Sequence, residues 1–242
     1  MPSAVSSGCA GLPASDPAVT PAVAAQAAAA APDAALRHYI RVYDDVLDPG
    51  MCRKLVDSFT ALARFQTVNG RGVRAGLEDS AWTELDVSRL SDAPFLSYFR
   101  QLVSRQLQRY NADVGLPIPV PDSPLLSPLI LKRYRAGSDE QFQTHFDSIN
   151  EVCDRYLVFL WYLNDVSEGG CTWFPGLQTG VPPRAGRLLM FPPYWLYAHQ
   201  GQPSPTQDKF ILSTYLRFVQ PGTGQGAPQS SVPQSSAPQS SA

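Results

Sequence analysis

Apolar residues recur at helical spacing near the start of the chain's first half. Asp48 followed by Pro49 is a typical helix start. Leu55, Phe59 and Leu62 then fall on one side of a helix, as expected for a segment that buries one face. The pattern predicts a helix that begins at Pro49 and packs through this apolar stripe.

A second helix is predicted to begin after Ser91 or Asp92 and to end between Asn111 and Gly115. Its buried face is marked by four apolar residues, Phe95, Phe99, Leu102 and Val103. The proline-rich stretch 117–128 follows and separates this helical half of the chain from the rest.

From Leu129 onward the pattern changes to short β-rich runs separated by turn residues. The predicted strands are 129–134, 156–162, 171–174, 187–191 and 209–218. Strands at this spacing are typical of a sandwich or a barrel. We therefore expect a mainly β protein with flanking helices and a double-stranded β-helix, or jelly-roll, core.

Composition divides the chain into three parts. Residues 1–36 are rich in Ala and Pro and have little apolar bulk, so we expect a disordered arm. Residues 220–242 repeat Pro-Gln-Ser-Ser and carry no charge, which predicts a low-complexity tail. The folded domain is then expected at 37–219, with a helical lead-in at 37–128 and the jelly-roll core at 129–219.

The overall charge excludes some classes of partner. A net charge of -2 disfavours binding to nucleic acid or to an anionic membrane surface. No apolar stretch is long enough for a membrane helix, and residues 1–36 lack the basic residues of a targeting signal. The four cysteines are irregularly spaced, so we interpret them as free thiols in a reducing compartment. These observations favour a cytoplasmic protein.

Three residues form a candidate metal site. His145 and Asp147 are two positions apart, so in an extended segment their side chains point the same way. His199 follows the strand predicted at 187–191, where a two-sheet fold brings it opposite this pair. Two histidines and one carboxylate are the facial triad of non-haem iron oxygenases. The same set also describes some zinc hydrolases, and His-x-Asp occurs by chance, so these residues alone leave the choice open.

Lys209 favours the iron reading. It begins a strand on which Lys209, Ile211, Ser213 and Tyr215 share one face. An inward lysine is costly to bury unless an anion meets it, and a dicarboxylate co-substrate supplies that anion. The alternative is that Lys209 starts the strand in solvent.

The segment 131–218 resembles the catalytic core of the prolyl 4-hydroxylase-like branch of the 2-oxoglutarate and Fe(II)-dependent dioxygenases. The matching pieces, in the family's order, are Tyr134-Arg-Ala-Gly137, His145-Phe-Asp147, Arg155, Tyr162-Leu-Asn-Asp165, Gly169-Gly170-Cys-Thr172-Trp-Phe174-Pro175, Pro183-Arg-Ala-Gly186, Phe191-Pro192, His199 and Lys209. The helical segment 39–65 resembles the family's lead-in helix more weakly.

The resemblance implies a role for individual residues. His145, Asp147 and His199 are expected to bind Fe(2+), and Lys209 to bind the C5 carboxylate of 2-oxoglutarate. Tyr134 is expected to line the co-substrate pocket, with Tyr162 and Thr172 as lesser candidates. O2 is the further co-substrate, and ascorbate is expected to support turnover.

The expected reaction is hydroxylation of a peptidyl prolyl or small amino-acid-like substrate, with release of succinate and CO2. The substrate is the open point, because fold-level analogy does not establish proline as the target. Two other readings are a zinc hydrolase, which has no use for Lys209, and a catalytically silent jelly-roll binding module. The oligomeric state is left open.

Overall fold

The computed structural model describes residues 32–73 and 75–219, in which two antiparallel sheets face each other. The large sheet has the order β1 (Arg41–Tyr43), β9 (Leu188–Phe191), β6 (Arg155–Tyr162), β11 (Lys209–Arg217), β4 (Ile130–Tyr134), β3 (Ala81–Asp86) and β2 (Thr67–Gly70). The small sheet has the order β5 (Phe142–His145), β10 (His199–Gly201), β7 (Thr172–Phe174) and β8 (Thr179–Val181). The expected jelly-roll core is confirmed.

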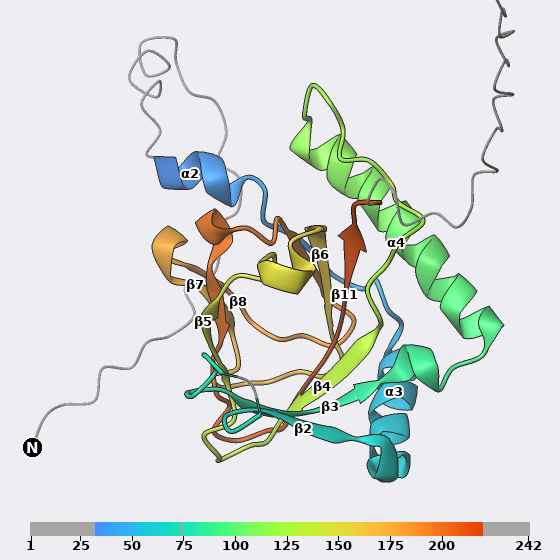
Figure 1. Ribbon diagram of the computed structural model, residues 1–242, viewed down its shortest axis with the longest axis vertical. Coiled ribbons are helices and arrows are strands. Elements are labelled where there is room, and N and C mark those ends of the chain that lie inside the picture. The colour runs from blue at the N-terminus through green and yellow to red at the C-terminus, as the bar shows by residue number, and fades with distance from the viewer. Residues whose placement is uncertain (1–31, 74, 220–242) are drawn as a thin grey trace, which may run out of the picture.

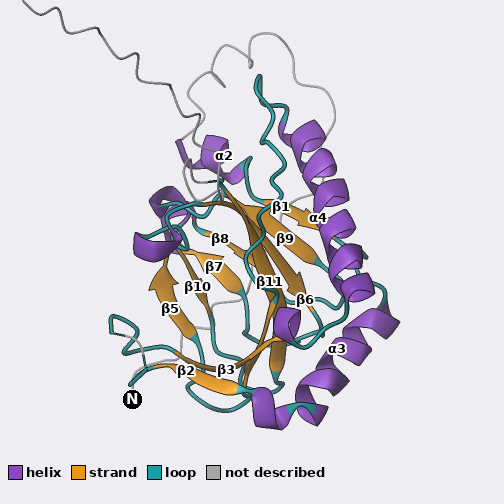
Figure 2. Ribbon diagram, turned by 45° about the vertical axis from the view of Figure 1, so that its right-hand side comes forward, coloured by secondary structure: helices purple, strands orange, loops and turns teal. Residues whose placement is uncertain are grey.

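Helices flank this core. The α-helices are α2 (Pro32–Arg37), α3 (Pro49–Ala61) and α4 (Ala93–Val114). Short 3-10 turns lie at Ala63–Phe65, Val87–Arg89, Asn150–Val152, Pro175–Leu177 and Trp195–Tyr197. In Figure 2, α3 and α4 lie along one side of the large sheet and the small sheet lies on the other.

Both long helices begin where the sequence predicts, and α4 also ends there. The Asp48 carboxylate accepts a hydrogen bond from the Met51 N–H at 3.0 Å, and Asp92 caps α4 in the same way through the Phe95 N–H, also at 3.0 Å. At the other end of α4, Gly115 has a φ of 65°, a left-handed conformation that costs glycine little. Local sequence is enough to set these helix ends.

Strand β11 separates two hydrophobic clusters. Leu212 and Leu216 belong to the cluster that α3 and α4 cover, together with Phe59 and Phe99 of those helices. Ile211 and Tyr215 belong to the cluster between the two sheets. Because neighbouring side chains in a strand point to opposite faces, one strand contributes to both clusters. The functional site lies on the second side, between the sheets.

The first half of the chain is less helical than the pattern predicts, because it also contains β1, β2 and β3. Strand β3 pairs with β4 from Thr83↔Arg133 to Asp86↔Ile130, and β1 pairs with β9. These partners lie far along the chain. The short strands β5, β8 and β10 were not predicted either, since a strand of three or four residues has too few positions to show a period.

The chain ends depart from expectation at one boundary. Helix α2 (Pro32–Arg37) overlaps the last residues of the arm that is predicted to be disordered, so the first helix begins earlier than expected. The Tyr197 hydroxyl group, which donates to the Leu36 carbonyl at 3.3 Å, helps to hold it. The rest of the arm, 1–31, and the tail, 220–242, lie outside the described residues. Within the described residues, no helix is both long and apolar enough to cross a membrane.

The cysteines also bring a correction. Cys52 and Cys153 are free thiols, as expected. Cys171 is fully buried and disulfide-bonded, so the interpretation of all cysteines as free is wrong there. Cys9 lies outside the described residues. Spacing along the chain says little about which cysteines meet in space. The cytoplasmic location stays a prediction.

Candidate active site

The three predicted metal ligands meet between the two sheets. His145 ends β5 and His199 begins the neighbouring strand β10, where the two residues are register partners. Asp147 lies between the two imidazoles: one carboxylate oxygen is 3.5 Å from Nε2 of His145 and the other is 3.5 Å from Nε2 of His199. One ligand atom from each of the three lies within 4.8 Å of the others. This spacing suits a single metal ion.

Hydrogen bonds orient both imidazoles. Nδ1 of His145 donates to the Gln143 carbonyl oxygen at 2.8 Å, and Nδ1 of His199 donates to the Tyr197 carbonyl oxygen at 3.1 Å. Because a carbonyl oxygen can only accept, Nδ1 carries the proton and the Nε2 lone pairs point toward Asp147. Burial lowers the pKa of His199 to about 4, with the charge of His145 contributing, so His199 is neutral near pH 7.

The Asp147 carboxylate is held ionised and in place. Burial by itself would raise its pKa, but His199, His145 and Arg155 outweigh burial and hold that pKa well below its usual range. The Tyr215 hydroxyl group donates to the carboxylate at 3.1 Å, and the Asp147 N–H donates to the Pro193 carbonyl oxygen at 3.0 Å. One carboxylate and two imidazoles are a donor set that fits Fe(2+).

A cavity lies beside these ligands, and Lys209 is buried in its wall. Only 1% of the Lys209 surface is exposed, so the alternative of a strand start in solvent is excluded. Its ammonium nitrogen is 5.0 Å from the centre of the Tyr134 ring, which faces it from β4. A Cβ at Gly201 would make an ordinary contact with this nitrogen, at 3.5 Å. Burial, followed by the charge of Lys132, lowers the pKa of Lys209 to about 7.

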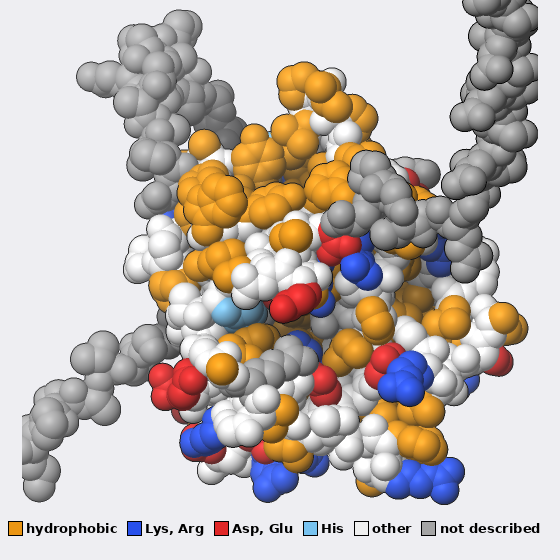
Figure 3. Space-filling model, viewed as in Figure 1, with side chains coloured by type: hydrophobic (Ala, Val, Ile, Leu, Met, Phe, Trp, Pro, Cys, Tyr) orange, Lys and Arg blue, Asp and Glu red, His pale blue; other side chains and the backbone are white. Residues whose placement is uncertain are grey.

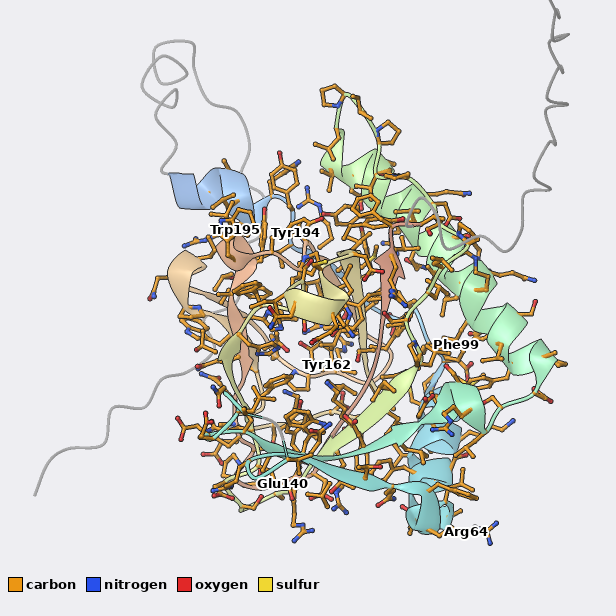
Figure 4. All side chains as sticks on the ribbon, in the orientation of Figure 1. Arg64, Phe99, Glu140, Tyr162, Tyr194 and Trp195 are labelled. Atoms are coloured by element: carbon orange, nitrogen blue, oxygen red, sulfur yellow. The ribbon has the colours of Figure 1, made fainter. Side chains whose placement is uncertain are left out.

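The lesser candidates differ in position. Thr172 lines the cavity, whereas Tyr162 lies behind it and donates a hydrogen bond to the Thr172 hydroxyl group at 2.7 Å. Figure 4 shows Tyr162 in the middle of the sandwich. Two lining residues, Lys132 and Phe142, were not singled out from the sequence. Lys132 could have been predicted from the sequence, because residues two positions apart in a strand share one face and Tyr134 was already expected to line the pocket.

A separate apolar hollow of about 460 Å³ lies away from this cavity and shares none of its lining residues. Its walls include Tyr39, Tyr156, Tyr194 and Tyr197, and the exposed Ile118 lies at its edge. Hydrophobic side chains gather over the upper part of the molecule in Figure 3. Tyr194 and its neighbour Trp195 lie at this end, near α2, in Figure 4.

Residues 129–217 match the model of the 2OG-Fe(II) oxygenase superfamily. The chain therefore carries a 2OG-Fe(II) oxygenase domain in this segment. The match contains all three residues of the His-Asp-His group as well as Lys209. The family implies Fe(2+), 2-oxoglutarate and O2 for this 2-oxoglutarate-dependent dioxygenase. No curated protein matches the chain by sequence.

Solved structures share the fold of this oxygenase. They include a viral collagen prolyl hydroxylase of Paramecium bursaria Chlorella virus-1 in complex with 2OG (20% identity, 75% of this chain and 97% of that chain, TM-score 0.51). A second is a Pseudomonas putida prolyl-4-hydroxylase, which is 16% identical (TM-score 0.54). The match covers 76% of this chain and 97% of that chain. A third is a Trichoplax adhaerens prolyl hydroxylase in complex with a hypoxia inducible factor peptide fragment, which is 17% identical (TM-score 0.58). The match covers 74% of this chain and 84% of that chain. At these identities the likeness supports the fold alone.

Proposed function

We propose that the chain hydroxylates a peptidyl prolyl or small amino-acid-like substrate, with His145, Asp147 and His199 holding Fe(2+). The observation that carries this proposal is the buried Lys209 ammonium group in the cavity that the three ligands border. Bound iron supplies the redox chemistry that couples oxidation of 2-oxoglutarate to succinate and CO2 with transfer of oxygen to the substrate.

Lys209 and Tyr134 are proposed to bind the co-substrate. The C5 carboxylate of 2-oxoglutarate would accept a charge-assisted hydrogen bond from Lys209, a bond of about 1.5–3 kcal/mol. Tyr134 packs against this lysine and is buried, so its ring limits where the ammonium group can move. A buried cation that meets a dicarboxylate explains why Lys209 lies inside at all.

The remaining wall residues serve the same chemistry. Phe142, Val158, Leu160 and Ile211 line the cavity and keep water away from the ligands. The Phe142 ring stacks on His145 with 3.6 Å between ring centroids, which holds the imidazole in its plane. Charge interactions are stronger in such a dry cavity than in water.

The apolar hollow supports a peptide as the substrate. Grooves lined by aromatic side chains are typical binding sites for proline-containing segments. One wall residue is linked to a predicted metal ligand through the backbone, because the Tyr197 carbonyl group accepts a hydrogen bond from His199. Among the fold relatives, the Trichoplax enzyme was solved with a peptide fragment.

The test is succinate release by the full chain with Fe(2+), 2-oxoglutarate and ascorbate, screened against proline, proline-containing peptides and small amino acids. Mass spectrometry should find one added oxygen atom in the true substrate. His145→Ala should abolish succinate release, whereas His38→Ala, a change at an exposed histidine outside the cavity, should leave it unchanged.

Metal analysis of protein purified without oxygen distinguishes the remaining readings. Iron that restores turnover supports the proposal. Zinc at full occupancy, with no succinate formed, would favour a hydrolase. Binding of 2-oxoglutarate without turnover on any substrate in the screen would favour a silent binding module.

A further inference from the structure

The chain leaves its last strand at the edge of the apolar hollow. Strand β11 ends at Arg217, and the next residue, Phe218, lines the hollow. The Phe218 ring packs on Tyr156 with 4.3 Å between ring centroids, and the Phe218 N–H donates to the Asp154 carbonyl oxygen at 2.8 Å. In Figure 1, β11 runs toward the end of the molecule at which α2 and the last turn of α4 lie. The tail, 220–242, therefore begins beside the hollow.

Hydrogen bonds hold the walls of the apolar hollow in place. The Asn111 side chain, on α4, donates to the Val120 carbonyl oxygen at 2.8 Å and accepts from the Val120 N–H at 2.9 Å. The Tyr156 hydroxyl group donates to the Pro121 carbonyl oxygen at 2.7 Å. Because these wall residues are already fixed, a ligand that binds there loses less conformational entropy in ordering them.

The apolar hollow offers aromatic rings and no charge. Among the described residues that line it, none has a charged side chain. Ile118 at its edge is 83% exposed, and Trp195, next to the wall residue Tyr194, is 68% exposed. Contiguous apolar surface of this kind marks an interaction site, because a partner that covers it removes it from water. Grooves lined by aromatic side chains bind proline-rich segments in the polyproline II conformation.

The tail has the composition that such a groove binds. It contains no charged side chain and repeats Pro-Gln-Ser-Ser from Pro228, Pro233 and Pro238. Proline fixes φ near about −65°, so a segment with repeated prolines is predisposed to polyproline II and loses little freedom on binding. The arm, 1–31, also contains prolines, but at irregular spacing and without this repeat. The tail is therefore the better match.

The first repeat is within reach of the apolar hollow. Pro228 is nine positions after Val219, so the connection can span on the order of 30 Å. Gly222, Gly224 and Gly226 lie in this connection, and glycine permits the backbone angles that reverse the chain direction. A short linker gives an effective concentration in the millimolar range. At micromolar protein concentrations the chain's own tail is therefore favoured over the tail of a second copy.

We propose that the apolar hollow is the docking site of the chain's own tail, with one Pro-Gln-Ser-Ser repeat at a time on its aromatic wall. The inference goes beyond the proposed function and does not depend on it, because this contact needs neither metal nor 2-oxoglutarate. It has one consequence for that function, since a peptide substrate that uses the hollow has to displace the tail.

The test measures competition between the tail and a free copy of its repeats. The probe is a fluorescein-labelled synthetic peptide with the sequence of residues 227–242. Fluorescence anisotropy reports its binding to the full chain, without added metal or 2-oxoglutarate. The same titration is repeated with a full-length variant in which all three repeat prolines are replaced, by Pro228→Ser, Pro233→Ser and Pro238→Ser.

A second variant tests the hollow itself. Ile118→Asp places a charge at the edge of the hollow, at a side chain that is exposed and so contributes little to packing. Val68→Asp, at an exposed position on β2 outside the hollow, is the matched control. Both are made in the triple-proline variant, in which the hollow is free to bind the peptide. Circular dichroism melting checks that each variant is folded.

Replacing the tail prolines should tighten binding of the free peptide about tenfold. This is the factor by which a tethered competitor at about 1 mM weakens a peptide with a dissociation constant of about 0.1 mM. Ile118→Asp should then weaken peptide binding at least about tenfold, because the apolar contact is replaced by a hydrated carboxylate. Val68→Asp should leave the affinity unchanged.

Four results would overturn the inference. If the triple-proline variant does not bind the peptide, the hollow is not a site for these repeats, and the proposed function still stands. Equal affinity for the unaltered chain and the triple-proline variant would show that the tail does not occupy the hollow. Peptide binding that Ile118→Asp leaves unchanged would place the repeats elsewhere. A mass that rises with concentration in sedimentation, but not in the triple-proline variant, would identify the tail of a second copy as the occupant.

Discussion

The two sheets contribute different chemistry to one cavity. The small sheet supplies the two histidines, from β5 and β10, while the large sheet supplies the two lysines, from β4 and β11. The histidines are neighbours on paired strands, and so are the lysines. In the proposed site the metal end and the anion end therefore belong to separate sheets, so we expect that each can be altered with the other left in place.

The largest effect should come from removing the carboxylate at the metal end. Asp147→Ala takes away one of three ligands, so metal affinity should fall by more than about 100-fold, the upper end of what loss of an outer-shell contact costs. Metal analysis after dialysis measures this, with Asp139→Ala as the control at an exposed site outside the cavity. If Asp147→Ala retains its iron in full, Asp147 is not a metal ligand.

A smaller effect is expected at the anion end. Lys209→Met should weaken 2-oxoglutarate binding about 10–150-fold, because a charge-assisted hydrogen bond of about 1.5–3 kcal/mol is lost. Metal content should not change, since Lys209 lies on the other sheet. Calorimetry and metal analysis on the same sample test the separation of the two ends. Loss of metal in Lys209→Met would show that the metal end and the anion end are not independent.

The anion end should also depend on pH. With a pKa of about 7, Lys209 is protonated below pH 7 and loses its proton above it in the protein without co-substrate. Binding of a carboxylate favours the protonated form, so above pH 7 binding requires proton uptake. The affinity for 2-oxoglutarate should therefore fall by up to about tenfold per pH unit between pH 7 and 9, as linkage requires.

Lys209→Arg tests the origin of this pH dependence. A guanidinium group stays protonated throughout this range, so the decline in affinity should be largely absent in the variant. Other ionisable groups that line the same cavity include Lys132, Asp147, His145 and His199. A slope that survives in Lys209→Arg would assign the pH dependence to one of those groups. Titrations at fixed ionic strength from pH 6 to 9 measure it.

The smallest effect is expected from a residue that links the two sheets. Tyr215 lies on β11 of the large sheet, and its hydroxyl group donates to the Asp147 carboxylate. Tyr215→Phe keeps the ring and removes this bond, so metal affinity should fall about tenfold, the lower end of the range for such contacts. 2-Oxoglutarate binding to the fully metal-loaded variant should be unchanged. A similar loss of both affinities would show that the two ends are coupled through this tyrosine.

Local sequence determined a large part of this architecture. Asp48 and Asp92 cap their helices through bonds to residues three positions away, so no distant contact is needed. The alternation along β11 predicted which side chains share a face with Lys209, and those residues do line the cavity. His145 and Asp147 are also close in sequence, which is why the pair stands out.

Tertiary structure decided the rest. Strands β5 and β10 are too short to show a period, and their pairing brings His145 and His199 together from distant parts of the chain. Lys132 acquires its position only because β4 pairs with β11, and Tyr215 meets Asp147 only because the two sheets face each other. Local pattern determines which way a side chain points, whereas only the pairing and packing of distant strands determine what it meets.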